Sequence, residues 1–238
     1  MSFCNVLITG ASRGLGLEFV KQFLSMKTSP KNVIATTRSS CDALDQLKEK
    51  YPNLHILKYE SLDYDNLNNF VEQIKQIVGN DGLDLLINNA GIFLQDTLET
   101  IDPITIVKNI ENNAVAPVIL TQKLLPLLKI ASKKRRTIVA QITSGLGSIC
   151  NNTMGGHYAY RASKAAMNML SKSLAVDVKS DNIIILLLHP GWVQTDLGSM
   201  HAPIKPPTSI SGMLKVIDDV TMDETGSFID FTGKKLPW

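Results

Sequence analysis

The chain has 238 residues and a formal net charge of +2, and hydrophobic residues make up 44% of it against 19% charged residues. This composition supplies a sizeable apolar core, and the length is typical of one α/β domain. The nearly balanced charge argues against nucleic acid or an anionic membrane as the main partner. Three widely spaced cysteines and four histidines form neither a disulfide framework nor a metal-ligand pattern, which favours a reduced, metal-free, cytoplasmic protein.

Strand-like and helix-like segments alternate along the whole chain. Continuous aliphatic runs indicate strands that are covered on both faces, and apolar residues at helical spacing separate them. This alternation predicts an α/β fold, in which a doubly wound parallel sheet of about seven strands has helices on both faces of a single domain, residues 1–238. The expected strands are Asn5–Thr9, Asn32–Thr37, Leu54–Tyr59, Leu83–Asn88, Thr137–Thr143, Ile183–Leu188 and Ser227–Phe231, and the expected helices are Gly14–Met26, Leu67–Val78, Ile104–Ile130 and Tyr158–Val178.

The first expected strand runs directly into the string TGASRGLG, Thr9–Gly16, which opens the first helix. Gly10, Gly14 and Gly16 allow a tight turn, a close approach of a pyrophosphate to the backbone, and close helix packing. The helix N-terminus offers free N–H groups and a positive dipole end to that anion. A strand before and a helix after this glycine pattern predict a dinucleotide-binding loop.

The end of the second expected strand indicates which dinucleotide binds. The string there is TTRSS, with Arg38 and no acidic residue. An acidic side chain at this place would hold the ribose 2′-hydroxyl of NAD, whereas an arginine pairs with the 2′-phosphate of NADP. Arg13, inside the glycine loop, adds a second positive charge, so we expect NADP(H) as the cofactor.

Three further strings follow later strands: NNAG (Asn88–Gly91), TSGLGS with YRASK (Tyr160–Lys164), and HPGWVQTD (His189–Asp196). Together with the glycine loop, their order and spacing resemble those of the short-chain dehydrogenase/reductase family over nearly the whole chain. The strings GGHYAYRASKAAMNM, HPGWVQTDLG and GKKLPW resemble more narrowly the sniffer-like and C-factor-like carbonyl reductases in this family.

The resemblance implies a catalytic set. Tyr160 matches the family's proton donor, Lys164 the lysine beside it, and Asn113 the helix asparagine that holds a water in a proton relay. Ser144 matches the serine that hydrogen-bonds the substrate carbonyl. In many members that serine lies about thirteen residues before the tyrosine. Here Ser148 lies twelve and Ser144 sixteen residues before Tyr160, so Ser148 remains the alternative to Ser144.

Helical geometry decides between the two tyrosines of HYAYRASK. Lys164 follows Tyr160 by four residues, a rotation of about 40°, so the two side chains share a face. Tyr158 precedes Lys164 by six residues and is turned about 240° away, which favours a packing role. A phenol next to an ammonium group suits proton donation to a carbonyl oxygen during hydride transfer, because the ammonium favours the phenolate.

The resemblance also implies the cofactor contacts. Val193 and Thr195 are expected beside the nicotinamide carboxamide, and Asn88 is expected both to line the cofactor and to tie strands together. Glu60 is expected either to contact the adenine or to be an exposed carboxylate. The full expected set is Gly10, Ser12, Arg13, Gly14, Leu15, Gly16, Arg38, Glu60, Asn88, Ala90, Gly91, Tyr160, Lys164, Pro190, Gly191, Val193 and Thr195.

These expectations lead to an NADPH-dependent carbonyl reductase acting on an aldehyde, ketone or quinone. An alcohol dehydrogenase working oxidatively and a non-catalytic NADP-binding sensor are the alternatives. We expect the Pro-rich segment after Asp196 to cover a fairly open pocket edged by Phe93, Leu94 and Trp192. In the family the two long helices pack against a second subunit, which predicts a homodimer or a tetramer, with no nucleic acid or membrane as a partner.

Overall fold

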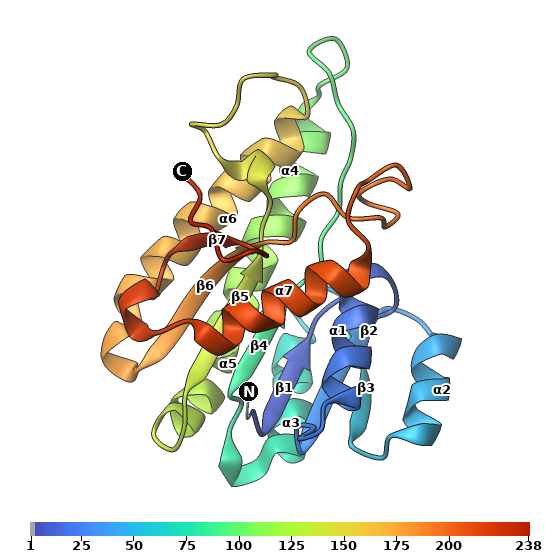
Figure 1. The fold of residues 1–238 in the computed structure, drawn as a ribbon, viewed down its shortest axis with the longest axis vertical. Coiled ribbons are helices and arrows are strands. Elements are labelled where there is room, and N and C mark those ends of the chain that lie inside the picture. The colour runs from blue at the N-terminus through green and yellow to red at the C-terminus, as the bar shows by residue number, and fades with distance from the viewer. Residues whose placement is uncertain (1–2) are drawn as a thin grey trace.

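The structure is a computed structural model that describes residues 3–238. Its strands form one parallel sheet in the order β3-β2-β1-β4-β5-β6-β7 (Figure 1). The predicted α/β fold is confirmed, and each expected strand is present within a few residues. The strands are β1 (Asn5–Ile8), β2 (Asn32–Thr37), β3 (Leu54–Lys58), β4 (Leu85–Asn88), β5 (Thr137–Ile142), β6 (Ile183–His189) and β7 (Phe228–Asp230).

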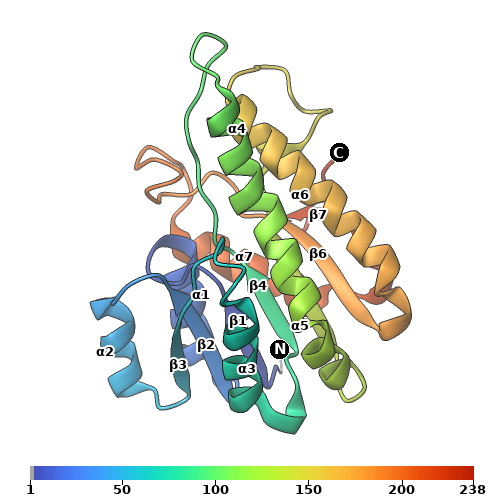
Figure 2. The ribbon, with the colours of Figure 1, turned by 180° about the vertical axis from the view of Figure 1, so that it is seen from behind.

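Helices cover both faces of this sheet, and each face has its own core. On one face α1 (Gly14–Ser25) and α7 (Pro206–Asp219) pack against the strands, together with α2 (Asp42–Lys50) near the β3 edge. On the other face lie α3 (Leu67–Val78), α5 (Ala116–Ser132) and α6 (Tyr158–Asp177) (Figure 2). The strands are buried from both sides because their side chains alternate between these two cores.

The sequence patterns did not predict α2 and α7. α2 has a single buried residue, Leu44, so it lacks an apolar stripe. α7 begins with Pro206 and Pro207, which we interpreted as part of the loop that covers the site. Proline is compatible with the first turn of a helix, because the N–H groups there have no intrahelical partner.

The predicted helix Ile104–Ile130 is continuous but changes its winding. α4 (Pro103–Ile110) passes into a π turn, Glu111–Val115, and then into α5. Asp102 caps α4, since its carboxylate accepts hydrogen bonds from the N–H groups of Ile104 and Thr105. π turns occur frequently at functional sites, and this one carries Asn113.

The same continuous helix, Pro103–Ser132, is long and apolar enough to span a membrane by length and composition. Half of its most apolar window is buried inside the protein, 50%. A core helix that packs against a sheet passes the same test, so this feature is weak evidence for a membrane. The expectation that no membrane is involved stays a prediction.

Candidate active site

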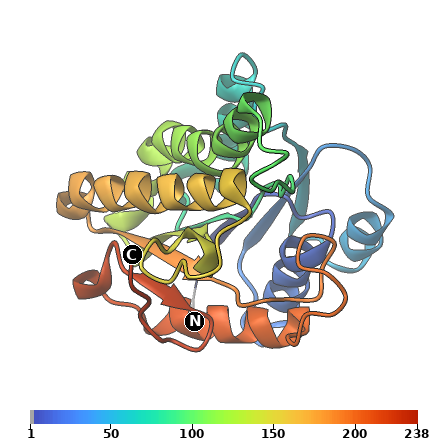
Figure 3. The ribbon, with the colours of Figure 1, turned by 90° about the horizontal axis from the view of Figure 1, so that it is seen from above.

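The segments that follow the parallel strands gather at one edge of the sheet, seen from above in Figure 3. Ligands of such sheets bind outside the carboxyl ends of the strands. The predicted site residues lie in these segments, except those on helices and Asn88, which ends β4.

The glycine loop between β1 and α1 depends on glycine at three positions. Gly10 has φ +65° and Gly14 has φ +55°, a left-handed conformation that side chains disfavour. A Cβ atom on Gly16 would lie 2.2 Å from the carbonyl oxygen of Gly10, so α1 packs on the loop only without one. α1 has no acidic residue in its first turn, which leaves its N-terminal N–H groups and dipole suited to an anion.

Asn89 fastens this loop to the segment after β4. Its Nδ2 donates hydrogen bonds to the carbonyl oxygens of Thr9 (2.9 Å) and Gly10 (3.1 Å). The backbone N–H groups of Asn89 and Ala90 both donate to the Thr9 hydroxyl at 3.0 Å. The role of Asn89 was not predictable from the sequence, because only the fold brings these segments together.

Asn88 does not tie strands together through its side chain, contrary to our expectation. Its Nδ2 donates to the carbonyl oxygen of Pro117 (3.3 Å) and to the hydroxyl of Thr121 (3.0 Å). Asn88 therefore anchors β4 to α5. The difference arises because Asn88 is the last residue of a strand and its buried side chain points to the helix layer.

The two arginines predicted to face a 2′-phosphate lie in different environments. Arg38 follows β2 with an exposed side chain, and within residues 3–238 no hydrogen bond or ion pair engages it. Arg13 instead forms an ion pair with Asp196, with 3.2 Å between Nε and Oδ2. Both partners are largely exposed, so this pair is weak and salt-sensitive. Glu60 is exposed just beyond β3.

The loop after β6 closes over the glycine loop. Gly191 has φ +81°, and a Cβ there would lie 2.5 Å from the Cδ1 of Ile204. Val193 is buried and pairs with Ile204 in an isolated bridge. A Cβ on Gly14 would lie 3.5 Å from the Thr195 methyl group, so the two loops lie close together. The remaining expected contacts in these segments are Ser12, Leu15, Gly91 and Pro190.

Ser144, Tyr160 and Lys164 meet where β5 ends and α6 begins. The Ser144 hydroxyl and the Tyr160 phenol are hydrogen-bonded. The Nζ atom of Lys164 lies 5.7 Å from the centre of the Tyr160 ring. It also donates a 2.9 Å hydrogen bond to the carbonyl oxygen of Ile142, the last residue of β5. Tyr158 is exposed at the start of α6.

Ser148, the alternative serine, is engaged elsewhere. It is buried, and its hydroxyl donates to the carbonyl oxygen of Pro237 at 2.8 Å. The position thirteen residues before Tyr160 is Gly147. A serine does not fit there, because a Cβ on Gly147 would lie 2.9 Å from the backbone of Lys164. The geometry thus brings Ser144, and not Ser148, to Tyr160.

Asn113 is completely buried in the π turn, and its side chain connects this turn to the segment after β4 and to α6. Its Oδ1 accepts from the N–H of Ile92 (2.8 Å), and its Nδ2 donates to the carbonyl oxygen of Ile92 and to the Ser163 hydroxyl, both at 2.9 Å. The Ser163 hydroxyl donates in turn to the carbonyl oxygen of Tyr160 at 2.8 Å. Ser163 lies within the YRASK string, but this contact between helices has no signal in the sequence.

Burial shifts the two titratable groups of the site in opposite directions. It raises the pKa of Tyr160 to about 12, although the hydrogen bond from Ser144 opposes the shift. It lowers the pKa of Lys164 to about 8. At neutral pH the phenol is therefore protonated and most lysine side chains are charged, and each is in the form that a proton donor and its neighbouring cation require.

One aromatic side chain, that of Phe93, borders the phenol. The Phe93 ring meets the Tyr160 ring edge to face, with 4.7 Å between centroids. Leu94 and Trp192 are exposed, and the Trp192 indole N–H donates to the carbonyl oxygen of Gly198. An apolar edge on an open pocket at these residues stays a prediction.

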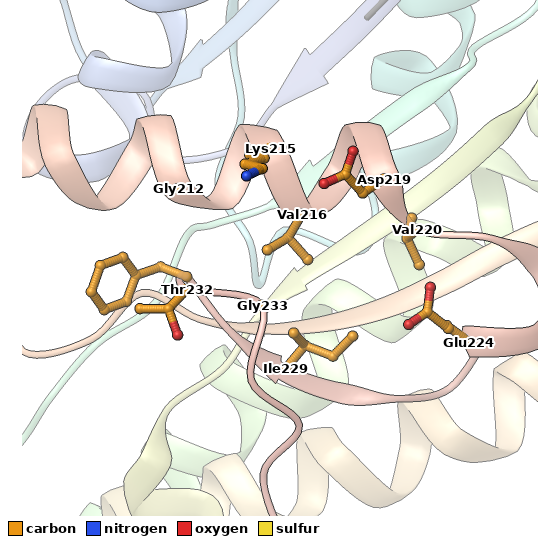
Figure 4. A pocket seen from close by; sticks show the side chains of 10 residues that line it. Gly212, Lys215, Val216, Asp219, Val220, Glu224, Ile229, Thr232 and Gly233 are labelled. Carbon is orange, nitrogen blue, oxygen red and sulfur yellow. The ribbon is translucent and has the colours of Figure 1, made fainter.

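A separate cavity of ≈240 Å³ lies between α7 and the chain around β7 (Figure 4). Lys215 and Asp219 of α7 border it on one side, and Glu224 and Ile229 border it on the other. None of the predicted site residues lines this cavity. It is therefore not part of the candidate active site.

Comparison with known proteins agrees with this geometry. A family model described as short chain dehydrogenase matches residues 4–203. The carbonyl reductase Sniffer of D. melanogaster has a TM-score of 0.97 and 35% identity, and the comparison covers 100% of both chains. An NADPH-bound carbonyl reductase from chicken fatty liver has a TM-score of 0.97 and 33% identity over 100% of both chains. C-signal of Myxococcus xanthus is 42% identical over 157 residues, 66% of this chain and 93% of that protein.

The sheet order, the glycine loop and the Ser-Tyr-Lys cluster together define an oxidoreductase that uses a dinucleotide. The family match covers most of the chain, and the chain belongs to the short-chain dehydrogenase family. The resemblance found in the sequence, including that to the Sniffer carbonyl reductases, is confirmed.

Proposed function

We propose that this protein is an NADPH-dependent carbonyl reductase that reduces an aldehyde, ketone or quinone to the corresponding alcohol. One observation carries the proposal: the half-buried phenol of Tyr160 is hydrogen-bonded to Ser144 and lies one helical turn from the buried ammonium of Lys164. A sensor that only binds a dinucleotide has no need of this arrangement. Several similar solved structures are carbonyl reductases.

The residues of this chain fit NADP(H). The glycine loop, free of acidic residues in the first turn of α1, suits a pyrophosphate. The exposed guanidinium of Arg38 suits a 2′-phosphate, and no carboxylate stands at the end of β2 to repel one. The chicken carbonyl reductase with the same fold was solved with NADPH bound.

When bound, NADPH supplies the hydride for the carbonyl carbon. Ser144 and Tyr160 then donate hydrogen bonds to the carbonyl oxygen, where negative charge develops. Tyr160 gives its phenolic proton to that oxygen as the general acid, and the Lys164 ammonium stabilises the resulting phenolate. Asn113 holds the segment that faces this cluster and lies within the expected proton relay.

We propose a homodimer as the basic assembly, from which a tetramer can be built. α4, α5 and α6 lie side by side on one face of the molecule (Figure 2). Exposed apolar side chains occur on α4 at Ile104 and Val107, and on α6 at Met169 and Val176. Burial of these side chains against a second copy would be favourable. We place the protein in the cytoplasm, because its three cysteines are free thiols.

The proposal is tested by incubating the purified protein with NADPH and separate panels of aldehydes, ketones and quinones. We expect oxidation of NADPH at 340 nm and formation of the matching alcohol, with NADH a much poorer donor. Faster turnover of alcohols with NADP⁺ at neutral pH would favour the oxidative dehydrogenase. Tight NADPH binding without turnover of any carbonyl compound would favour the sensor.

A further inference from the structure

The segment between β4 and α4 carries a buried carboxylate, Asp96, whose side chain is only 4% exposed. Its Oδ2 accepts a 2.8 Å hydrogen bond from the backbone N–H of Ala159, 63 residues further along the chain. Its backbone carbonyl accepts a 3.3 Å hydrogen bond from the N–H of His157. Asp96 thus holds the beginning of α6 from outside that helix.

α6 depends on this external contact because it lacks a cap of its own. Its N-cap residue, His157, is in the left-handed region with φ +51° and makes no capping hydrogen bond with its side chain. The first N–H groups of a helix have no intrahelical partner, and a carboxylate there also interacts favourably with the helix dipole. The bonded residue, Ala159, directly precedes Tyr160.

The same segment places Phe93 against the phenol. The Phe93 ring makes edge-to-face contacts with Tyr160 (4.7 Å between centroids) and with His157 (5.1 Å). The side-chain amide of Asn113 holds the backbone of the neighbouring Ile92 by two hydrogen bonds. Asp96 is therefore the second attachment point of the segment, and Phe93 lies between the two.

A purely structural cap does not account for this arrangement. The Oδ1 of Asp96 and the Nδ1 of His157 are buried and, within residues 3–238, have no hydrogen-bond partner. A buried carboxylate with an unmatched oxygen destabilises a fold. By contrast, Asp102 at the other end of the same segment satisfies both oxygens at the α4 N-terminus, with the N–H of Ile104 (2.8 Å) and the Thr105 hydroxyl (2.6 Å).

We propose that Asp96 is a positioning residue for Tyr160. It fixes the first turn of α6 and the Phe93 segment, so that the phenol stays directed at the Ser144 hydroxyl. The proposal rests on the proposed function, in which Tyr160 is the proton donor. Asp96 itself touches neither cofactor nor substrate and acts through Tyr160.

The test compares Asp96→Asn and Asp96→Ala with Asp102→Asn and Asp102→Ala as matched controls. An amide oxygen still accepts from Ala159 but carries no charge, so we expect Asp96→Asn to lose several-fold in kcat. Asp96→Ala is expected to lose about 10- to 100-fold, the scale on which small displacements of catalytic groups act. The NADPH dissociation constant should stay within about twofold in both, because the effect is confined to the phenol. Asp102→Ala should melt earlier because it removes the cap of α4, and Asp102→Asn, which can still cap the helix, should change less, but both should keep the kcat of the wild type.

Equal kcat in the wild type and both Asp96 variants would overturn the proposal, as would a loss in the Asp102 variants as large as that in the Asp96 variants. If Asp96→Ala does not fold, the Asp96→Asn and Asp102→Asn pair decides. A wild type without carbonyl reductase activity would refute the proposed function, not the positioning. NMR of ring-labelled tyrosine would then test the positioning. We expect the Tyr160 signal to shift in Asp96→Asn and not in Asp102→Asn. An unchanged Tyr160 signal in Asp96→Asn would refute the positioning role of Asp96.

Discussion

Lys164→Met tests whether the ammonium group of the site is held away from water. Methionine keeps an unbranched chain of similar length and removes the charge. Burial lowers the pKa of Lys164 from 10.5 to about 8. At about 1.36 kcal/mol per pKa unit, keeping this buried group charged costs the folded protein about 3 kcal/mol.

The sign of the effect follows from proton binding. The folded protein loses the Lys164 proton from about pH 8 upward, whereas the unfolded chain keeps it up to about 10.5. Between these values the unfolded chain binds more protons, so the free energy of unfolding of the wild type rises with pH. In the variant this rise is absent, but the carbonyl oxygen of Ile142 has lost its donor, which costs about 1–2 kcal/mol at every pH.

We therefore expect the cofactor-free variant to be more stable than the wild type by about 1–2 kcal/mol at pH 7. The two should be about equal near pH 9, and the wild type should be the more stable above pH 10. Urea unfolding at these three pH values measures the difference. Lys172→Met, at an exposed position on α6, is the control and should show no such trend. A stability difference for Lys164→Met that does not change between pH 7 and 10 would refute the reasoning.

Three further predictions concern the reaction. Arg38→Asp should weaken NADPH binding by about 10- to 100-fold and shift the preference to NADH, because repulsion replaces a charge-assisted pair. An unchanged ratio of kcat/KM for NADPH to kcat/KM for NADH would contradict this. Ser144→Ala should lower kcat by about 100-fold, whereas Ser148→Ala should mainly lower the melting temperature, because the Ser148 hydroxyl donates to Pro237. A larger loss of kcat in Ser148→Ala than in Ser144→Ala would identify Ser148 as the serine that binds the substrate carbonyl. The kcat/KM of reduction should fall above about pH 8, where Lys164 loses its charge, and a profile that is flat to pH 10 would show that this charge is not needed.

Much of the fold was predictable from the sequence because the signals are local. Aliphatic runs such as Ile183–Leu188 identify a strand covered on both faces without knowledge of its neighbours. The glycine loop and the Tyr160–Lys164 spacing are also local, since both depend on the geometry of one turn or one helix. α2 was missed because it buries one residue only, and α7 because its first residues are prolines.

The unpredicted features depend on contacts between distant segments. Asn89 reaches the glycine loop 80 residues away, and Asp96 reaches α6 across 63 residues. The ion pair between Arg13 and Asp196 joins two different loops and was not predictable either. The choice between Ser144 and Ser148 likewise depended on where the C-terminal segment docks, and no spacing rule contains that information.

The central claim is that Tyr160 donates the proton during carbonyl reduction, and Tyr160→Phe tests it most directly. Phenylalanine keeps the ring that packs on Phe93 and removes only the hydroxyl. NADPH binding, followed by titration of cofactor fluorescence, is expected to remain within about twofold of the wild type, while kcat falls by at least about 100-fold, the usual contribution of a general acid. A Tyr160→Phe enzyme that reduces the same carbonyl compound at a rate close to that of the wild type would contradict the account.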